Sequence, residues 1–175
     1  MIHFTFAVFL GCQDKSYTNP QKAAPEVTGA VKTVSPELSE HMAVVLSDYE
    51  KIRNALVEDS LEGLEDACDR IIAAAKKAEH AAPDQLKPKF TDVSAKAALL
   101  RQASKEDMEG ARQLFGDLSR PVVDVLRSEP QLSQGLYLFE CPMAQDYPFW
   151  VQQKKGIENP YMGSKMLACG TPVTW

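Results

Sequence analysis

Between residues 36 and 128 the apolar side chains recur every three or four positions, and this spacing constrains the fold more than any other feature. The first run places seven apolar residues on one stripe: Leu38, Met42, Val45, Leu46, Tyr49, Ile52 and Leu56. This period is typical of an amphipathic helix that buries one face. A chain of 175 residues, 45% of them hydrophobic, is long enough for one domain with a real core.

Capping residues and prolines divide this region into helices. Ser35 and Pro36 suit the start of the first helix, as its N-cap and its first residue. The apolar pattern then breaks, and we expect Asp59 or Ser60 to cap a second helix. Pro83 should end that helix, because proline cannot continue the hydrogen-bond ladder.

Two further helices are expected before the composition changes. The third lies between about residues 84 and 103, with Pro88 in its first turn, and the fourth opens at a capping box over residues 104–107. Pro121 should kink the fourth helix. Four striped helices with short loops are best buried together, so we expect an all-α fold. Its form would be an up-down four-helix bundle, followed by a mostly irregular C-terminal segment that contains Cys and Met.

The N-terminus predicts export and lipid attachment. An apolar run over residues 4–10 is too short to span a bilayer, but it suits a signal peptide. The tetrapeptide Phe9-Leu10-Gly11-Cys12 resembles a bacterial lipobox, which implies a lipid on Cys12 and, with Gln13 next, the outer membrane facing the periplasm. We therefore expect a signal peptide over 1–12, a flexible tether over 13–35 and one domain over 36–175. The alternative is a cytoplasmic protein whose N-terminal apolar residues pack on its body.

Charge and motifs exclude several function classes. The chain has 24 acidic and 19 basic side chains, a net charge of -5, and no Lys/Arg-rich run, so nucleic-acid binding is not expected. It carries no Ser/His/Asp order, Gly-rich phosphate loop or zinc-hydrolase helix motif. We therefore expect a protein that is not an enzyme.

Sulfur is concentrated in the last forty residues. Cys141 and Met143 flank a proline, and Met162, Met166 and Cys169 are spaced so that a helix would align them on one face. Thiolates and thioethers select soft ions such as Cu(I), whereas zinc sites prefer thiolate and imidazole, and this segment has no histidine. The composition therefore favours Cu(I) or Ag(I) over zinc.

The strings CPMA and NPYMGSKMLACG, with a Trp between them, also resemble a bacterial family of domains of unknown function. That family is found as periplasmic proteins or appended to adaptor subunits of copper and silver efflux systems. The resemblance covers roughly residues 40–171 and is most specific in the motif 135–171. It implies a helical bundle, export and a heavy-metal role. The implied metal ligands are Cys141, Met143, Met166 and Cys169, with Met162 as a further candidate, and the implied site-shaping residues are Trp150, Asn159, Pro160, Tyr161 and Gly163.

A disulfide between Cys141 and Cys169 is the competing interpretation. In an oxidising periplasm such a bond is common, and the methionines would then be packing residues. The two interpretations are compatible as redox states of one pair. Two functions follow: a periplasmic protein that binds or senses Cu(I) or Ag(I) and hands it to an efflux adaptor, or a structural or interaction module of the cell envelope that docks on a partner and holds no metal.

Overall fold

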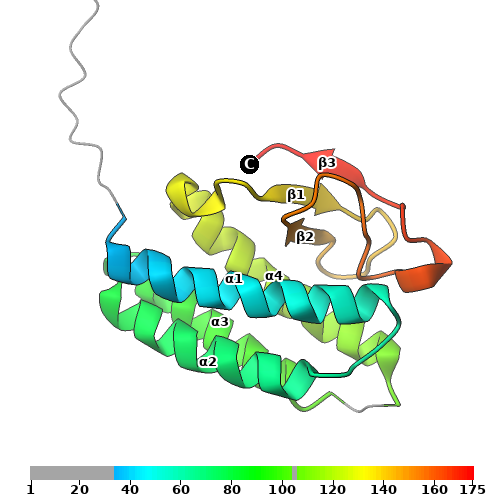
Figure 1. The fold of residues 1–175 in the computed structure, drawn as a ribbon, viewed down its shortest axis with the longest axis horizontal. Coiled ribbons are helices and arrows are strands. Elements are labelled where there is room, and N and C mark those ends of the chain that lie inside the picture. Colours follow the sequence, from blue (N-terminus) through cyan, green and yellow to red (C-terminus); the bar gives the residue numbers. More distant parts are fainter. Residues whose placement is uncertain (1–33, 104–105) are drawn as a thin grey trace, which may run out of the picture. The chain divides into compact units, whose positions relative to one another are not determined.

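The computed structural model describes residues 34–103 and 106–175 (Figure 1). The predicted signal peptide, Cys12 and all but the last two residues of the predicted tether lie outside the described residues. Four helices account for most of the described chain, as predicted: α1 (Pro36–Val57), α2 (Leu64–Ala81), α3 (Lys87–Leu100) and α4 (Met108–Ser128). Consecutive helices lie side by side and run in opposite directions (Figure 1). None of the helices described is both long and apolar enough to cross a membrane.

The helix starts follow local capping chemistry. The Ser35 hydroxyl accepts a hydrogen bond from the Leu38 N–H at 3.1 Å, as predicted for α1. At α4 the cap is Asp107, whose carboxylate accepts from the Gly110 N–H at 2.8 Å. Ser104, the first residue of the predicted capping box, lies outside the described residues.

The predicted start of the second helix is wrong. Helix α2 begins at Leu64, after Gly63, which has a φ of +72° and provides no side-chain cap. Asp59 does not cap the helix, because its carboxylate instead accepts hydrogen bonds from Arg112 and from the Ser164 N–H. The Ser60 hydroxyl accepts from the N–H only two residues on, in the turn before the helix. Tertiary contacts therefore override the local signal.

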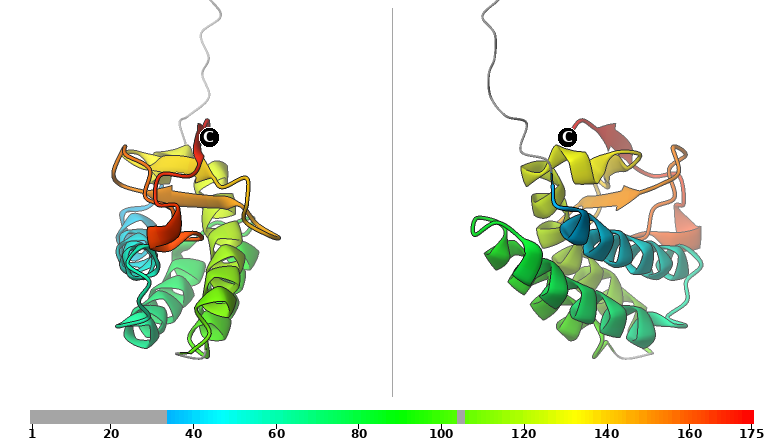
Figure 2. Two further views of the ribbon diagram at one scale, coloured as in Figure 1. Left: turned by 90° about the vertical axis from the view of Figure 1, so that its right-hand side faces the viewer. Right: turned by 60° about the vertical axis from the view of Figure 1, so that its left-hand side comes forward.

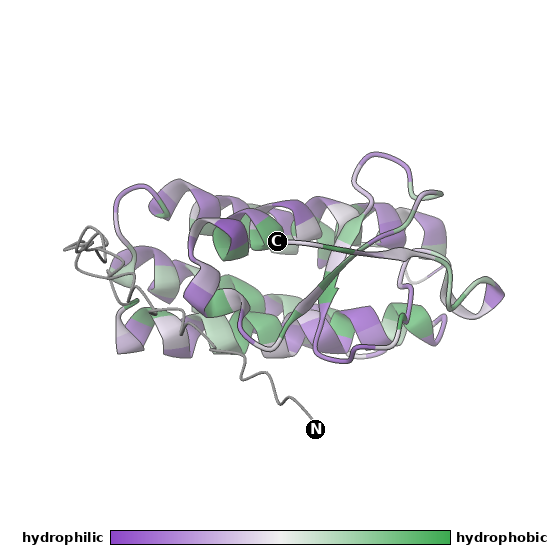
Figure 3. Ribbon diagram, turned by 90° about the horizontal axis from the view of Figure 1, so that it is seen from above, coloured by the Kyte–Doolittle hydropathy of each residue, from purple (hydrophilic) through white to green (hydrophobic). Residues whose placement is uncertain are grey.

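The apolar stripes meet in one core. Figure 3 shows the hydrophobic residues along the inner faces of the helices and the hydrophilic ones outside. Tyr49 of α1, Phe90 of α3 and Phe115 of α4 are fully buried. Cys68 of α2 is a buried free thiol in this core, and burial raises its pKa to about 12.

The fold is mostly helical and has four helices, as expected of an all-α bundle, but a small sheet that was not expected follows the helices. Strands β1 (Tyr137–Glu140), β2 (Phe149–Gln152) and β3 (Thr171–Val173) form an antiparallel sheet in the order β2-β1-β3. A short 3₁₀ helix, η1 (Pro130–Ser133), precedes the sheet, and another, η2 (Gly163–Lys165), lies between β2 and β3.

The sheet and the loops around it form a C-terminal layer, residues 137–175, over α1 and α4. Figure 2 shows this layer lying along the side of the bundle where those two helices face it. The ring of Phe115 lies 4.9 Å from that of Tyr49 and 5.9 Å from that of Tyr161, so an aromatic cluster joins the helices to the layer. At Gly116 of α4 a Cβ would lie 3.2 Å from the Tyr147 carbonyl oxygen, so the layer approaches the helix backbone closely.

Candidate metal site

The two cysteines of the C-terminal layer come together at one end of the sheet. Cys141 directly follows β1 and Cys169 stands two residues before β3. Because Glu140 of β1 pairs with Thr171 of β3, the antiparallel register brings the residues just beyond them side by side. The two thiols lie close enough for Cys141 to raise the pKa of the Cys169 thiol. The sulfur pair is therefore a product of strand pairing.

Both residues of this thiol pair, Cys141 and Cys169, are free cysteines. The Cys141 side chain is fully buried, and its N–H donates to the Pro148 carbonyl oxygen at 2.9 Å. Cys169 is partly exposed. Loss of hydration raises the pKa of the Cys169 thiol, and the neighbouring Cys141 raises it further. The raised pKa keeps the Cys169 thiol protonated near neutral pH, so a metal must displace its proton in order to bind.

Each thiol stands at one end of a tight turn that also carries a methionine. The Ala144 N–H donates to the Cys141 carbonyl oxygen at 3.2 Å, which closes a turn containing Met143. The Cys169 N–H donates to the Met166 carbonyl oxygen at 3.0 Å, which closes the second turn. The side chains of Met143 and Met166 are 56% and 41% exposed, so both thioethers are open to solvent.

The predicted helical alignment of Met162, Met166 and Cys169 is wrong. Only the three residues of η2 are helical there, and Met166 has left the helical conformation, with φ -147° and ψ 56°. Gly163 has a φ of +56°, which breaks the period directly after Met162. The Met162 side chain instead lines a cavity of about 170 Å³ together with Met143.

Asn159 ties the turn that follows it in the sequence to the turn that ends at Cys169. Its side chain is fully buried, and its amide nitrogen donates to the Cys169 carbonyl oxygen. Its amide oxygen accepts from the N–H groups of Tyr161 at 2.8 Å and Met162 at 3.3 Å. Its own N–H donates to the carbonyl oxygen of Leu167 at 2.8 Å. One side chain thus sets the position of the Cys169 backbone.

The other residues expected to shape the site hold the loop against the sheet. The Tyr161 hydroxyl donates to the Phe149 carbonyl oxygen at 2.7 Å, and its ring meets the Trp150 ring edge-on at 5.9 Å. Trp150 is fully buried and stacks on Phe139 at 5.4 Å. A Cβ at Gly170, beside Cys169, would lie 2.8 Å from the Trp150 ring, so this ring supports the backbone next to the thiol.

A buried arginine of α4 anchors the same loop, and the sequence reasoning missed it. The Arg112 Nε donates to the Pro160 carbonyl oxygen at 3.0 Å and its Nη2 donates to the Leu56 carbonyl oxygen at 3.1 Å. Its Nη2 also bonds the Asp59 carboxylate. Gly163 lies against this ion pair, since a Cβ there would overlap both Asp59 and Arg112.

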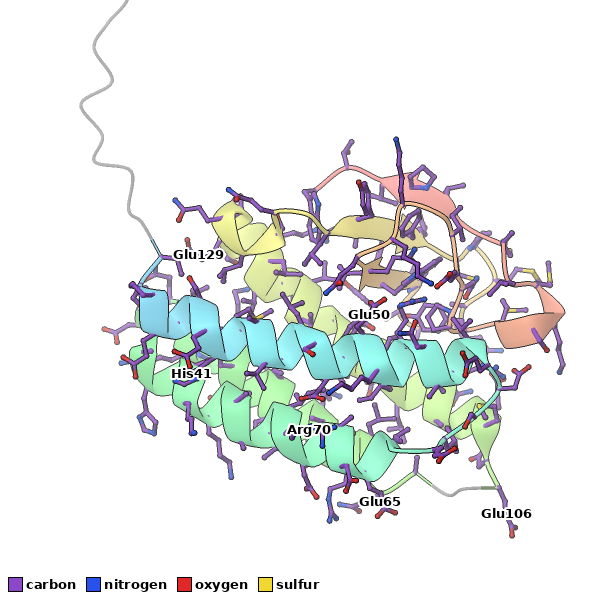
Figure 4. The ribbon with its side chains drawn as sticks, viewed as in Figure 1. His41, Glu50, Glu65, Arg70, Glu106 and Glu129 are labelled. Carbon is purple, nitrogen blue, oxygen red and sulfur yellow. The ribbon has the colours of Figure 1, made fainter. Side chains whose placement is uncertain are left out.

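A second buried arginine, Arg53 of α1, holds the start of the loop. It donates to the Glu158 carbonyl oxygen at 2.9 Å and forms ion pairs with the carboxylates of Glu158 at 3.0 Å and Glu50 at 2.8 Å. In Figure 4, Glu50 lies on the side of α1 that faces the C-terminal layer, whereas Arg70 of α2 lies on the opposite side. The pKa of Glu158 is lowered, first by its hydrogen bond from Lys154 and then by Arg53.

One sequence signal could have identified these arginines. Arg53 lies four residues after Tyr49 and three before Leu56, and Arg112 lies three before Phe115. Both charges therefore fall on the buried stripe of their helix, where an arginine is seldom found without a partner.

The described residues contain no group of three or more His, Cys, Asp or Glu side chains that could hold a metal ion. The candidate ligands are therefore the thiol pair and the nearby thioethers.

Comparisons with protein-family models, with curated proteins and with solved structures found no match for this chain.

Proposed function

We propose that this protein is a non-enzymatic envelope protein that binds or senses Cu(I) or Ag(I) through Cys141 and Cys169. The observation that carries the proposal is the pairing of β1 with β3, which brings two free thiols near each other from positions 28 residues apart in the sequence. Paired thiolates favour Cu(I) and other soft ions over hard oxygen-preferring ions.

The surroundings of the thiol pair support a soft ion rather than zinc. A closed zinc site takes four ligands, usually thiolate or imidazole, and the described residues offer no histidine or carboxylate cluster here. Cu(I) and Ag(I) accept thiolates and thioethers, and Met143 and Met166 lie on the same turns as the two cysteines. Met166 remains a candidate additional ligand of the ion at the thiol pair, and Met143 a candidate thioether ligand beside it.

The site is also held in place before any ion arrives. Asn159 fixes the Cys169 backbone, and Arg112 fixes the neighbouring Pro160 carbonyl group. A ligand pair that is already held close together loses little conformational freedom on binding, which favours affinity. Burial of Cys141 limits access of water to the bound ion.

A competition titration tests this function. Reduced full-length protein is titrated with Cu(I) against a Cu(I) chelator, alongside the Cys141→Ser/Cys169→Ser variant and a Cys68→Ala control. We expect wild type and the control to retain one Cu(I) more than the double variant. Equal retention by wild type and the double variant contradicts the proposal.

The same thiol pair favours a second candidate function, a structural or interaction module locked by a Cys141–Cys169 disulfide. The thermal midpoint separates the two. An ion that binds only the native state raises the thermal midpoint of the reduced protein. If the disulfide is purely structural, reduction lowers the thermal midpoint strongly and added metal does not change it.

The resemblance to domains associated with copper and silver efflux supports a place for this function in the periplasm, with a lipid on Cys12 as the membrane anchor. An efflux adaptor or another envelope protein would then receive the ion. Growth of cells that lack this protein, compared with cells that carry the Cys141→Ser/Cys169→Ser variant, on silver salts tests that role.

A further inference from the structure

A cavity lined by residues of α4 and of the C-terminal layer carries a second set of soft ligands. Met143 and Met162 both line this cavity of about 170 Å³, between α4 and the loops of the C-terminal layer. Met143 is more than half exposed and Met162 partly exposed, so both thioethers can be reached from solvent. Two thioethers on one accessible cavity are a ligand set that soft monovalent ions accept and hard ions do not.

The thioether pair and the thiol pair share the same two supports. Met143 lies two residues after Cys141, inside the turn that the Cys141 carbonyl group closes. The Met162 N–H and the Cys169 carbonyl group are both hydrogen-bonded to the Asn159 side chain. Met143 is therefore linked to Cys141 through the backbone, and Met162 is linked to Cys169 through the Asn159 side chain.

The charges around the cavity are balanced. Arg112 lines it, but its guanidinium pairs with Asp59 and donates to two backbone carbonyl groups. Glu109 and Lys165 also line the cavity; both are exposed and opposite in sign. A single positive ion can therefore be accepted there without an unpaired buried charge opposing it.

We propose that Met143 and Met162 form an outer site for one Ag(I) or Cu(I) ion, distinct from the thiol pair, from which the ion reaches the cysteines. Thioethers carry no proton, so binding at this outer site does not depend on pH in the way that thiol binding does. This inference deepens the proposed metal-binding function and rests on it for the onward step.

The decisive experiment uses a cysteine-free full-length chain: Cys12→Ser, Cys68→Ala, Cys141→Ser and Cys169→Ser. Ag(I) binding is measured by calorimetry at about pH 5 in a chloride-free buffer, with circular dichroism as the check on folding. We expect one Ag(I) per chain, lost on adding Met143→Leu/Met162→Leu and kept on adding Met108→Leu. No Ag(I) binding by the folded cysteine-free chain, or binding that survives the paired Met143→Leu/Met162→Leu change, overturns the outer site.

A second measurement does not depend on the cysteine-free chain folding. With all cysteines present and reduced, the Met143→Leu/Met162→Leu variant should bind one Ag(I) fewer than wild type. An equal count overturns the outer site. Failure of the thiol function is a separate result, because it shows as equal Cu(I) retention by wild type and the Cys141→Ser/Cys169→Ser variant.

Discussion

Gly163 shows how strongly single residues determine the position of the candidate site. It combines a left-handed backbone conformation with a close approach to the Asp59–Arg112 ion pair. Gly135 shares the positive φ but has open space around its α-carbon, and Gly156 has open space and no positive φ. The three glycines therefore separate backbone strain from steric overlap.

We predict that Gly163→Ala lowers the free energy of unfolding by about 3 kcal/mol, because strain and overlap add. Gly135→Ala should cost about 1 kcal/mol from strain alone, and Gly156→Ala should stay within about 0.5 kcal/mol of wild type. Urea denaturation of the three variants measures this order. A Gly163→Ala variant as stable as Gly135→Ala would show that the overlap with the ion pair is absent.

Protonation of the thiols predicts a pH dependence of metal binding. Because burial and the neighbouring Cys141 raise the pKa of Cys169, its thiol is protonated near neutral pH and Cu(I) must displace that proton. The affinity for Cu(I) should therefore rise between about pH 6 and pH 8. Titrations at several pH values, corrected for protonation of the competing chelator, measure it. A flat profile in wild type, equal to that of Cys141→Ser/Cys169→Ser, contradicts thiolate ligation.

At the scale of elements, the helices were predictable and their partner layer was not. The stripe from Leu38 to Leu56 and the prolines beside each helix are local signals, and they give helices close to those observed. Strand β2 has four residues of which three are buried, so it shows no alternation, and β3 contains a proline. These strands form because each pairs with one edge of β1. Such long-range pairing cannot be predicted from a local sequence pattern.

The candidate site was predictable only in part, for the same reason. The residue types of the motif pointed to Cys141 and Cys169, but their proximity depends on the register between β1 and β3. The positions of the methionines depend on where η2 ends. The sequence pattern placed Met162 with Met166 and Cys169, whereas in the structure it lines a cavity with Met143. Arg112 was not predicted because it donates a hydrogen bond to a backbone carbonyl group, that of Pro160, in a loop far away in the sequence.

The docking of the loop on α4 predicts a large effect of Arg112→Met. The change leaves the Pro160 carbonyl oxygen without its donor, removes one donor from the Leu56 carbonyl oxygen and leaves Asp59 without its ion-pair partner. We expect a loss of about 3 kcal/mol in the free energy of unfolding and weaker retention of Cu(I). Denaturation and the chelator titration measure the two effects.

Two comparison variants give this prediction its specificity. Arg101→Met removes an exposed pair with Asp69 and should change little, because solvent screens such pairs. Arg112→Lys should not restore stability, because one ammonium group cannot reproduce the directed bonds of a guanidinium. Equal effects of Arg112→Met and Arg101→Met would contradict the anchoring role.

Over the whole described molecule, residues 34–103 and 106–175, the bundle is a scaffold and the C-terminal layer contains the candidate site. The layer is attached to α1 and α4 by an aromatic cluster and by the two buried arginines. Two carboxylates at these attachments are held in their charged form. Hydrogen bonds from Ser164 and then Arg112 lower the pKa of Asp59, and Lys154 and then Arg53 lower that of Glu158.

Acid should therefore weaken the whole fold through these two carboxylates. A pKa that is lower in the folded state than in the unfolded chain adds stability above about pH 4, and this stability is lost as the pH falls through the folded value. We predict that wild type loses more stability between about pH 5 and pH 2 than Asp59→Asn/Glu158→Gln does. Urea denaturation followed by tryptophan fluorescence measures both slopes; parallel slopes would contradict the prediction.

The central claim is that Cys141 and Cys169 bind one soft ion together. X-ray absorption at the copper edge tests it most directly, on reduced Met143→Leu/Met162→Leu protein loaded with one Cu(I) per chain, so that the outer site does not contribute. We predict that sulfur ligands surround the copper and that adding Cys141→Ser/Cys169→Ser removes them. Copper bound mainly by nitrogen and oxygen, or a spectrum unchanged by the cysteine substitutions, would contradict the claim.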